Sequence, residues 1–309
     1  MKKVGLIIVA MVGIMGFFWI TNVVNQTPHD EPKRTLQIKK MKQLKVKKLT
    51  TTASAAVVLN RDTGQLVGTK NGTQPLAIAS ISKLMTGYLT LEKLAMTDMI
   101  EPSANTVKIG EEPELEAVPL DAGTTYRTGD LLNAALQLSA NDAAIALGDE
   151  ISGSQARFAK LMTATAKQWD IKTAKWYNAA GIRNDEMEDD KVNAPNNAEN
   201  MMSAIDVAKM SEQILKHQPK IIAILDQTTS TFNGTTQASN FSLMNNYFSQ
   251  TKYQVTAGKL GVSVKSGVSF VGFFTYKKHH YVTVVLHADQ YKNLAAVFRE
   301  TKRILDETV

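Results

Sequence analysis

Apolar and polar residues are distributed differently before and after about residue 53. Before it, an unbroken apolar run covers residues 4–20, and a polar, basic stretch follows. After it, apolar residues recur at short intervals as far as the last residue. At residues 55–70, "AAVVLNRDTGQLVGTK" alternates apolar and polar residues around "RDTG", which predicts a β-hairpin. Beyond residue 53 there is no internal repeat or Pro/Gly-rich linker, so we expect one domain over 53–309.

Helical periodicity dominates the middle of this domain, and strand patterns return near its end. Apolar spacing predicts helices from Ser80 onward and over 128–140, 141–152, 154–169 and 203–217. The stretches 260–267, 269–277 and 281–288 resemble short strands joined by turns, and 293–308 resembles a closing helix. Strands at both ends with helices between them predict an α+β fold. Its antiparallel sheet is expected to unite the chain ends under a helical layer.

The first 52 residues predict a membrane segment and a tether. Two lysines precede the apolar run, which reaches about 25 Å as a helix, the short limit for a bilayer core. This is the pattern of an export signal, but no small-residue cleavage site follows closely. We therefore expect residues 1–24 to be an uncleaved signal anchor; a cleaved one would give a secreted protein. Residues 25–52 are predicted to be a basic tether, either lying on an anionic membrane or wall surface or simply solvated.

The net charge of +6 belongs to the tail. Residues 1–52 hold ten basic and two acidic residues, which leaves 53–309 with a net charge of −2. A nucleic-acid-binding domain is expected to be basic on its own surface, so we expect no nucleic-acid partner. The chain has no cysteine, which excludes disulfides, thiolate metal sites and a cysteine nucleophile. No two histidines have the helical spacing of metal ligands, so we predict neither a metal nor a cofactor.

Ser80 and Lys83 are the first candidates for catalysis. They lie three residues apart ahead of a helical pattern, in "ASISKLMTGYL". At that spacing both side chains share one helix face, close enough for the lysine amine to take the serine proton. Chance also supplies this spacing often, so further partners are needed.

Two later motifs offer such partners. "QLSANDAAIAL" supplies a hydroxyl and an amide, Ser139 and Asn141, at the junction of two helical patterns. "VSVKSGVSF" supplies a lysine triplet, Lys265, Ser266 and Gly267, within a strand pattern. S-x-x-K, a serine motif and a lysine triplet, in this order, form the motif set of penicillin-binding proteins and class A β-lactamases.

Over residues 53–309 the chain resembles the low-molecular-mass penicillin-binding proteins, the serine-type D-alanyl-D-alanine carboxypeptidases of the S11 peptidase type. Beyond the three motifs, "LLNAALQLSANDAAIAL", "NAAGI" and "MMSAIDVAKMSEQILKHQPKI" are similar to family segments in the family's order. The resemblance implies the β-lactamase/DD-peptidase-like fold, with a helical subdomain beside the sheet.

The resemblance also implies a role for each candidate residue. Ser80 would be the acylated nucleophile and Lys83, once desolvated, its base. Ser139 would relay a proton to the leaving D-alanine together with the lysine of the triplet, and Asn141 would bind a substrate amide.

The lysine triplet and the residue after it would bind the substrate. Lys265 and Ser266 would recognise the terminal carboxylate, with Ser266 standing where the family usually has threonine. The strand from Lys265 would pair with the peptide, and Gly267 would allow its close approach. The backbone N–H of Val268, with that of the nucleophile, would form the oxyanion hole.

The function implied is removal of the terminal D-alanine from peptidoglycan pentapeptides. This is a step in cell-wall biosynthesis that would influence cell shape. It would proceed through an acyl-enzyme that β-lactams trap, on the extracytoplasmic face of a bacterial membrane. A class A β-lactamase would need a glutamate in an E-x-x-L-N context between Asn141 and Lys265, and the chain has none. A DD-endopeptidase could use the same residues, and a wall-binding protein with a decayed site would be a function without catalysis.

Overall fold

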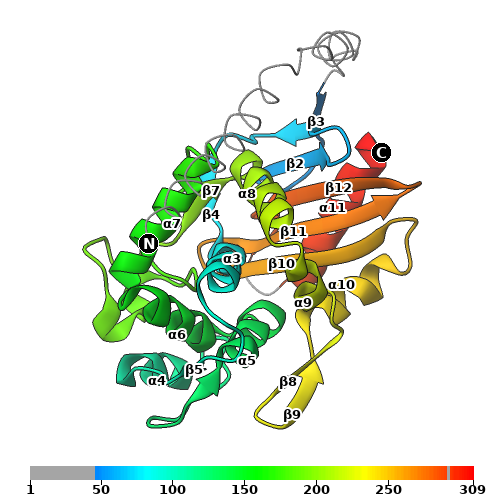
Figure 1. The fold of residues 1–309 in the computed structure, drawn as a ribbon. Helices are drawn as coiled ribbons and strands as arrows, with labels where there is room; N and C mark the ends of the chain where they lie inside the picture. Colours follow the sequence, from blue (N-terminus) through cyan, green and yellow to red (C-terminus); the bar gives the residue numbers. More distant parts are fainter. Residues whose placement is uncertain (1–45, 291–292) are drawn as a thin grey trace, which may run out of the picture. The chain divides into compact units, whose positions relative to one another are not determined.

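The structure is a computed structural model that describes residues 46–290 and 293–309 (Figure 1). These residues belong to one compact unit, Lys45–Val309. The predicted anchor over 1–24 and the tether as far as residue 45 lie outside the described residues. Within the described residues, no helix has the length and apolar character needed to cross a membrane.

A six-stranded sheet joins the two ends of this unit, as predicted. Its strands lie in the order β1-β3-β2-β12-β11-β10. Their bounds are β1 Lys47–Lys48, β2 Ala55–Asn60, β3 Gln65–Lys70, β10 Gln254–Ser263, β11 Gly267–Tyr276 and β12 His279–Leu286. Neighbouring strands are antiparallel except for β1, which runs parallel to β3. The predicted hairpin over 55–70 is therefore confirmed as β2 and β3.

The folded unit begins earlier than residue 53. Lys47 and Lys48 pair with β3, and the side chain of Leu49 is buried in the core. Thr50 donates its backbone N–H and its hydroxyl to the carboxylate of Glu307, near the last residue. The last part of the predicted tether therefore belongs to the fold, because its apolar and hydroxyl side chains find partners there.

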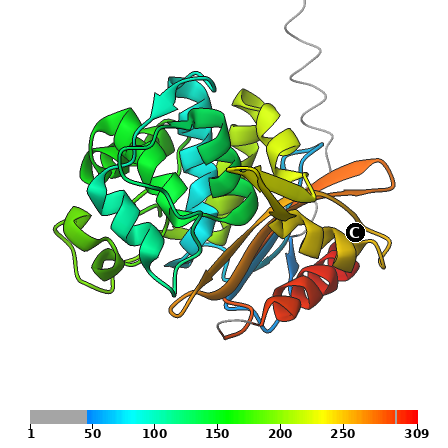
Figure 2. The ribbon, with the colours of Figure 1, turned by 90° about the horizontal axis from the view of Figure 1, so that it is seen from below.

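Alternation along the strands divides the core between the two faces of the sheet. In β2, Ala55 and Val57 join one apolar cluster, whereas Ala56 and Val58 join the other. Helix α11 (Leu294–Thr308) packs on the second face and α8 (Ala204–His217) on the first. Figure 2 shows the sheet between α11, in red, and the helices drawn in green and cyan.

The helical part packs around α3 (Lys83–Lys93), which contacts α5, α6, α7 and α8. The remaining helices are α4 Ala104–Glu111, α5 Thr128–Asn133, α6 Asn141–Ser152, α7 Gln155–Gln168, α9 Lys220–Leu225 and α10 Asn240–Phe248. Three two-stranded pairs complete the unit: β4 Pro75–Ala77 with β7 Met201–Ser203, β5 Met99–Ile100 with β6 Tyr126–Arg127, and β8 Thr229–Phe232 with β9 Thr235–Ala238.

The helix predicted over 128–140 is interrupted. After α5 the backbone widens into a π-helical turn, Ala134–Leu138, and ends at Ser139. The φ of Ser139 is 66°, in the left-handed region that non-glycine residues rarely adopt. π-Helical turns and strained residues of this kind gather at functional sites.

Candidate active site

The first candidate, Ser80, lies in a tight turn at the start of α3. It belongs to a 3₁₀ turn, Ala79–Ser82, that leads directly into the helix, and 7% of Ser80 is exposed. Two glycines allow neighbouring segments to pack against this turn. A Cβ on Gly181 would lie 2.1 Å from the carbonyl oxygen of Ala79, and one on Gly261 would lie 2.5 Å from that of Ile78. Side chains at either glycine would push the turn away.

Lys83 is completely buried, and its amine meets the serine. Its Nζ lies 2.7 Å from Ser80 Oγ, 2.7 Å from Asn141 Oδ1 and 2.9 Å from the carbonyl oxygen of Ala180. Burial, followed by the charge of Lys259, holds the pKa of Lys83 well below its usual range. The predicted serine–lysine pair is therefore brought together, with its amine in a setting that favours the neutral form.

The segment "NAAGI" explains why a carbonyl faces the lysine. The side-chain oxygen of Asn178 accepts hydrogen bonds from the backbone N–H groups of Ala180 and Gly181. This closes a tight loop whose Ala180 carbonyl points to Lys83. The "NAAGI" segment thus shapes the site through its backbone groups and not through catalytic side chains.

Asn141 begins α6 and joins Lys83 to the loop that precedes it. Its Oδ1 accepts from Lys83, while its backbone N–H and its Nδ2 both donate to the carbonyl oxygen of Glu116, at 2.7 and 2.9 Å. The predicted asparagine is therefore at the site, with its orientation fixed by two elements.

Ser139 is held by a second buried lysine, which is Lys259 and not Lys265. Lys259 Nζ donates to Ser139 Oγ at 2.9 Å and to the carbonyl oxygen of Leu260 at 3.2 Å. Burial lowers the pKa of Lys259 to about 8, against the smaller opposing effect of the Glu116 carboxylate. Lys259 lies in β10, the edge strand of the sheet, which packs against the turn that carries Ser80.

The prediction for the triplet at 265–267 is wrong. Lys265 and Ser266 lie in the turn between β10 and β11, so they do not form a strand beside the cleft. Lys265 is exposed and donates to the carbonyl oxygen of Asn197 at 3.1 Å, whereas the hydroxyl of Ser266 donates to that of Gly267. Neither side chain touches a candidate catalytic group.

Gly267 and Val268 also serve the hairpin and not the predicted oxyanion hole. Gly267 has a φ of +54°, and a Cβ there would lie 2.0 Å from the carbonyl oxygen of Asp289. The backbone N–H of Val268 donates to that same carbonyl oxygen at 3.1 Å. This N–H is therefore already paired, and the side chain of Val268 is fully buried.

The chain contains a second lysine–x–glycine triplet, Lys259–Leu260–Gly261, which has no hydroxyl at its middle position and is not among the predicted site residues. One signal favours it. The pattern "GVSFVGFFTY" is a strand beginning at Gly267, and an antiparallel partner requires a turn immediately before it. That requirement puts Lys265 in the turn and Lys259 in the strand.

A cleft of about 320 Å³ opens beside Ser80. Ser80, Asn141, Val262 and Ser263 line it, together with three glutamates at 114, 116 and 186. The guanidinium of Arg183, which also lines it, donates to both carboxylate oxygens of Asp185, at 2.8 and 2.7 Å. The cleft therefore has an acidic lining, and its arginine, Arg183, is already paired with Asp185.

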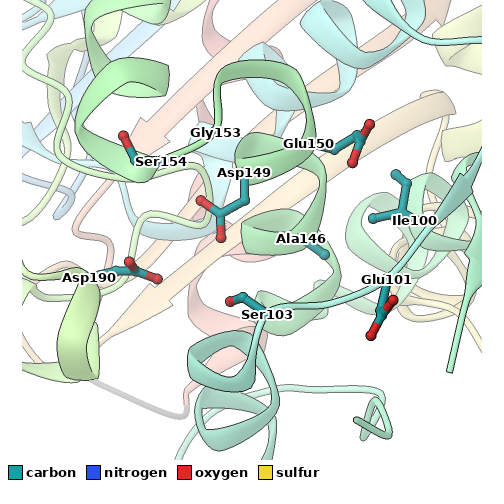
Figure 3. A pocket seen from close by; sticks show the side chains of 9 residues that line it. All are labelled: Ile100, Glu101, Ser103, Ala146, Asp149, Glu150, Gly153, Ser154 and Asp190. Carbon is teal, nitrogen blue, oxygen red and sulfur yellow. The ribbon is translucent and has the colours of Figure 1, made fainter. Parts of the chain in front are cut away.

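A separate hollow of about 460 Å³ lies in the helical part, beside α6 (Figure 3). Asp149, Glu101, Glu150 and Asp190 line it, and burial raises the pKa of Asp149 to about 6. Within residues 46–290 and 293–309, no group of three or more His, Asp or Glu side chains is arranged so that it could hold a metal ion, here or elsewhere. Neither Ser80 nor either buried lysine reaches this hollow.

A serine hydroxyl against a buried amine, beside a cleft and a strand edge, is the geometry of serine–lysine acyl-transfer enzymes. The sequence profile of the S11 peptidases, described as D-alanyl-D-alanine carboxypeptidase, matches residues 41–290. The chain therefore belongs to this family.

Individual relatives agree with this assignment. The chain is 29% identical over 171 residues to the D-alanyl-D-alanine carboxypeptidase DacF of Bacillus subtilis, covering 54% of this chain and 40% of that protein. It is 26% identical over 261 residues to DacC of Escherichia coli, covering 82% and 60%. The chain thus spans between two fifths and three fifths of the length of these two curated relatives.

Solved structures show the same fold. A peptidoglycan synthesis regulatory factor, PBP3, from Streptococcus pneumoniae superposes with a TM-score of 0.77 at 32% identity, over 84% of this chain and 74% of that one. Penicillin-binding protein D2 of Listeria monocytogenes, in its ampicillin-bound form, gives a TM-score of 0.68 at 22% identity, over 84% and 98%. The predicted α+β, DD-peptidase-like fold is confirmed.

Proposed function

We propose that this protein is a serine-type D-alanyl-D-alanine carboxypeptidase that removes the terminal D-alanine from peptidoglycan pentapeptides. The observation that carries the proposal is the 2.7 Å contact between Ser80 Oγ and the fully buried amine of Lys83. Membership of the S11 family supports the choice of substrate.

Lys83 acts as the base that activates Ser80. A neutral amine has two N–H donors and one lone pair. Asn141 Oδ1 and the Ala180 carbonyl are both acceptors and take the two N–H groups. The lone pair then faces the hydroxyl of Ser80, takes its proton and frees Oγ to attack the carbonyl carbon of the penultimate D-alanine.

Ser139 and Lys259 supply the proton that the leaving amine requires. Their 2.9 Å contact lies beside the nucleophile, and a lysine with a pKa of about 8 can give up a proton near neutral pH. The leaving D-alanine departs as an amine, and water then hydrolyses the ester on Ser80.

The edge of β10 that has no neighbouring strand binds the peptide as an added strand. β10 is the last strand of the sheet, so one side of its backbone has no strand partner within the sheet. Val262 follows Gly261 and lines the cleft with Ser80, and we assign the oxyanion hole to the backbone N–H groups of these two residues. Removing one such donor typically costs around 3 kcal/mol of transition-state stabilisation.

A DD-endopeptidase is the second candidate function. The chain is 30% identical over 132 residues to a D-alanyl-D-alanine endopeptidase of Pseudomonas aeruginosa, covering 42% of this chain and 41% of that protein. Leu260, buried in the core, stands where the triplet of the family has a hydroxyl. The site therefore lacks one group that could hold the free carboxylate of a carboxypeptidase substrate.

The proposal includes a location and an inhibitor class. We propose that residues 1–24 anchor the enzyme on the extracytoplasmic face of the membrane, where its substrate lies. Penicillin-binding protein D2, a structural neighbour, is known in ampicillin-bound and cefotaxime-bound forms. By analogy, β-lactams should acylate Ser80.

Covalent labelling with a fluorescent penicillin tests this function. The full chain should carry a stable label that Ser80→Ala abolishes and Ser103→Ala leaves unchanged, because Ser103 only caps α4. Release of D-alanine from a pentapeptide, compared with cleavage of a cross-linked dimer, then separates the two candidate activities. An equal label on the Ser80→Ala protein would refute the assignment of the nucleophile.

A further inference from the structure

Glu199 is a buried acid beside the cleft that the reaction described above does not use. It is fully buried, and its Oε2 lies 2.9 Å from the hydroxyl oxygen of Ser263, which lines the cleft. Its other oxygen, Oε1, has no hydrogen-bond partner among the described residues. If the Glu199 carboxylate were ionised, burying this oxygen without a hydrogen-bond partner would cost a large desolvation free energy.

Counting the hydroxyl protons around Ser263 shows which form of Glu199 fits. Ser266 Oγ donates its only proton to the carbonyl oxygen of Gly267 at 3.1 Å. Ser263 Oγ also contacts Ser266 Oγ at 3.0 Å and Glu199 Oε2 at 2.9 Å, and its single proton can serve only one of these two contacts. With the proton of Ser266 on Gly267 and that of Ser263 on Ser266, the contact with Glu199 is made by a proton of Glu199.

The charges around Glu199 do not overcome this preference. Arg183 and Glu186 face it from the segment around residue 185, and Lys265 faces it from the β10–β11 turn. Burial raises the pKa of Glu199 and Glu186 adds to this, while Ser263, Lys265 and Arg183 lower it, with a net rise. Two of these charges are also partly satisfied elsewhere, since Arg183 binds Asp185 and Lys265 binds the Asn197 carbonyl.

The segment that carries Glu199 also supports the nucleophile. The carbonyl oxygen of the next residue, Asn200, accepts the backbone N–H of Ile78, two residues before Ser80. The side chain of Asn200 binds Asn178, which shapes the loop that faces Lys83. One short segment thus fixes both the β10 wall of the cleft and the approach to Ser80.

We infer that Glu199 is a positioning residue that works as an uncharged acid, donating a proton to Ser263 and so fixing the β10 wall against which the substrate peptide lies. The inference rests on the proposed function for its effect on catalysis. When Glu199 loses its proton, the contact with Ser263 loses its donor, and the wall no longer has a fixed position. Substrate binding should suffer, while the chemistry at Ser80 should change little.

The variant Glu199→Gln tests this directly, because a glutamine amide donates to Ser263 and cannot ionise. At the acidic end of the profile, where Glu199 holds its proton, the KM of this variant for a D-Ala-D-Ala peptide should match that of wild type. As pH rises and Glu199 ionises, the KM of wild type should rise about fivefold above that of the variant, with little change in kcat, since one hydrogen bond is lost. Glu199→Met, which cannot donate, should have the raised KM at every pH.

A second readout does not require turnover. A buried acid held neutral binds its proton more tightly in the folded state, so wild type should lose stability relative to Glu199→Gln as pH rises from about 4.5. Melting temperatures that change in parallel with pH in the two proteins would overturn the inference, as would a Glu199→Gln variant that binds substrate poorly at the acidic end of the profile. If penicillin does not label the wild-type protein, but the melting temperatures of wild type and Glu199→Gln diverge as pH rises, only the proposed activity is refuted and the role of Glu199 stands.

Discussion

At the scale of single residues, the site is governed by two buried lysines that differ in pKa. Burial lowers the pKa of both, but Lys83 also feels the charge of Lys259 and falls further. The carboxylate of Glu116, on the rim of the cleft, opposes this by raising the pKa of each. Glu116 is therefore expected to set the pH at which the site becomes active.

Replacing Glu116 by glutamine should lower the pKa of Lys83 and of Lys259. Since the proposed mechanism uses Lys83 in its neutral form, the acidic limb of the rate of penicillin acylation should move to lower pH. Glu111→Gln, at the exposed end of α4, is the matched control and should leave the limb in place. A limb that moves to higher pH, or does not move, contradicts this electrostatic account.

Leu260 offers a test of leaving-group recognition. Leu260→Thr gives the triplet the hydroxyl that the family carries at this position and should favour D-Ala-D-Ala peptides over their C-terminal amides by about fivefold, the worth of one hydrogen bond. Leu260→Val removes a similar volume without adding a hydroxyl and controls for repacking. The ratio of kcat/KM values for the two substrates is the measurement. An equal gain in both variants would argue against a role for the hydroxyl.

At the scale of elements, local patterns were enough to identify half of the site. Ser80 with Lys83, and Ser139 with Asn141, are spaced by a helical turn or a helix junction, so their proximity follows from short-range geometry. The lysine that contacts Ser139 could not be identified from short-range geometry. Lys259 and Lys265 both begin a triplet ending in glycine, and only the position of the β10–β11 turn distinguishes them.

The faces of the sheet were predicted better than its edges. Alternation in β2 predicted a hairpin with opposed faces, and the structure has one. The pairing of β1 with β3 depends on Leu49 and on Glu307 in the last helix, about 260 positions apart in the chain, and no local pattern records that contact. The helical pattern over 128–140 likewise does not predict the π-helical turn before Ser139.

Gly261 shows how one element positions another. Gly261→Ala would place a Cβ 2.5 Å from the Ile78 carbonyl, so β10 must move away from the turn that carries Ser80. The contact of Lys259 with Ser139 should then break, and acylation should slow at least about tenfold, as when a catalytic donor is lost. Gly64→Ala, which has space but a φ of +69°, is the control. It should lower the melting temperature without slowing acylation of the remaining folded protein.

At the scale of the whole molecule, stability should depend on two carboxyl groups in α6, the buried Asp142 and the half-buried Asp149. Burial raises the pKa of both Asp142 and Asp149 to about 6. Each binds its proton more tightly in the folded state than in the unfolded state. Folded stability should therefore fall as pH rises from about 4 to about 7.

Asp149→Asn should remove part of that fall. In Figure 3 the Asp149 carboxylate lies in the same hollow as Asp190, whose charge adds to the effect of burial. At about pH 8 the variant should gain on the order of 2 kcal/mol relative to wild type, and at about pH 4 almost nothing. Melting temperatures across this range measure the difference, with Asp130→Asn as an exposed control. A gain of the same size at both ends would exclude ionisation as its cause.

The order of strands in the sheet also constrains how the chain can be synthesised. β12 lies between β2 and β11 and is the last of the six strands to be synthesised. The β2–β3 hairpin, which is synthesised early, therefore cannot join β10 and β11 until β12 has left the ribosome. Until then β2 has an open edge, and Lys259 has no fixed place beside Ser139. A growing chain therefore has no working site and does carry a strand edge prone to aggregation. Premature stop codons anywhere before residue 279 should give insoluble, inactive products, and folding should be slow because its decisive contacts span the chain.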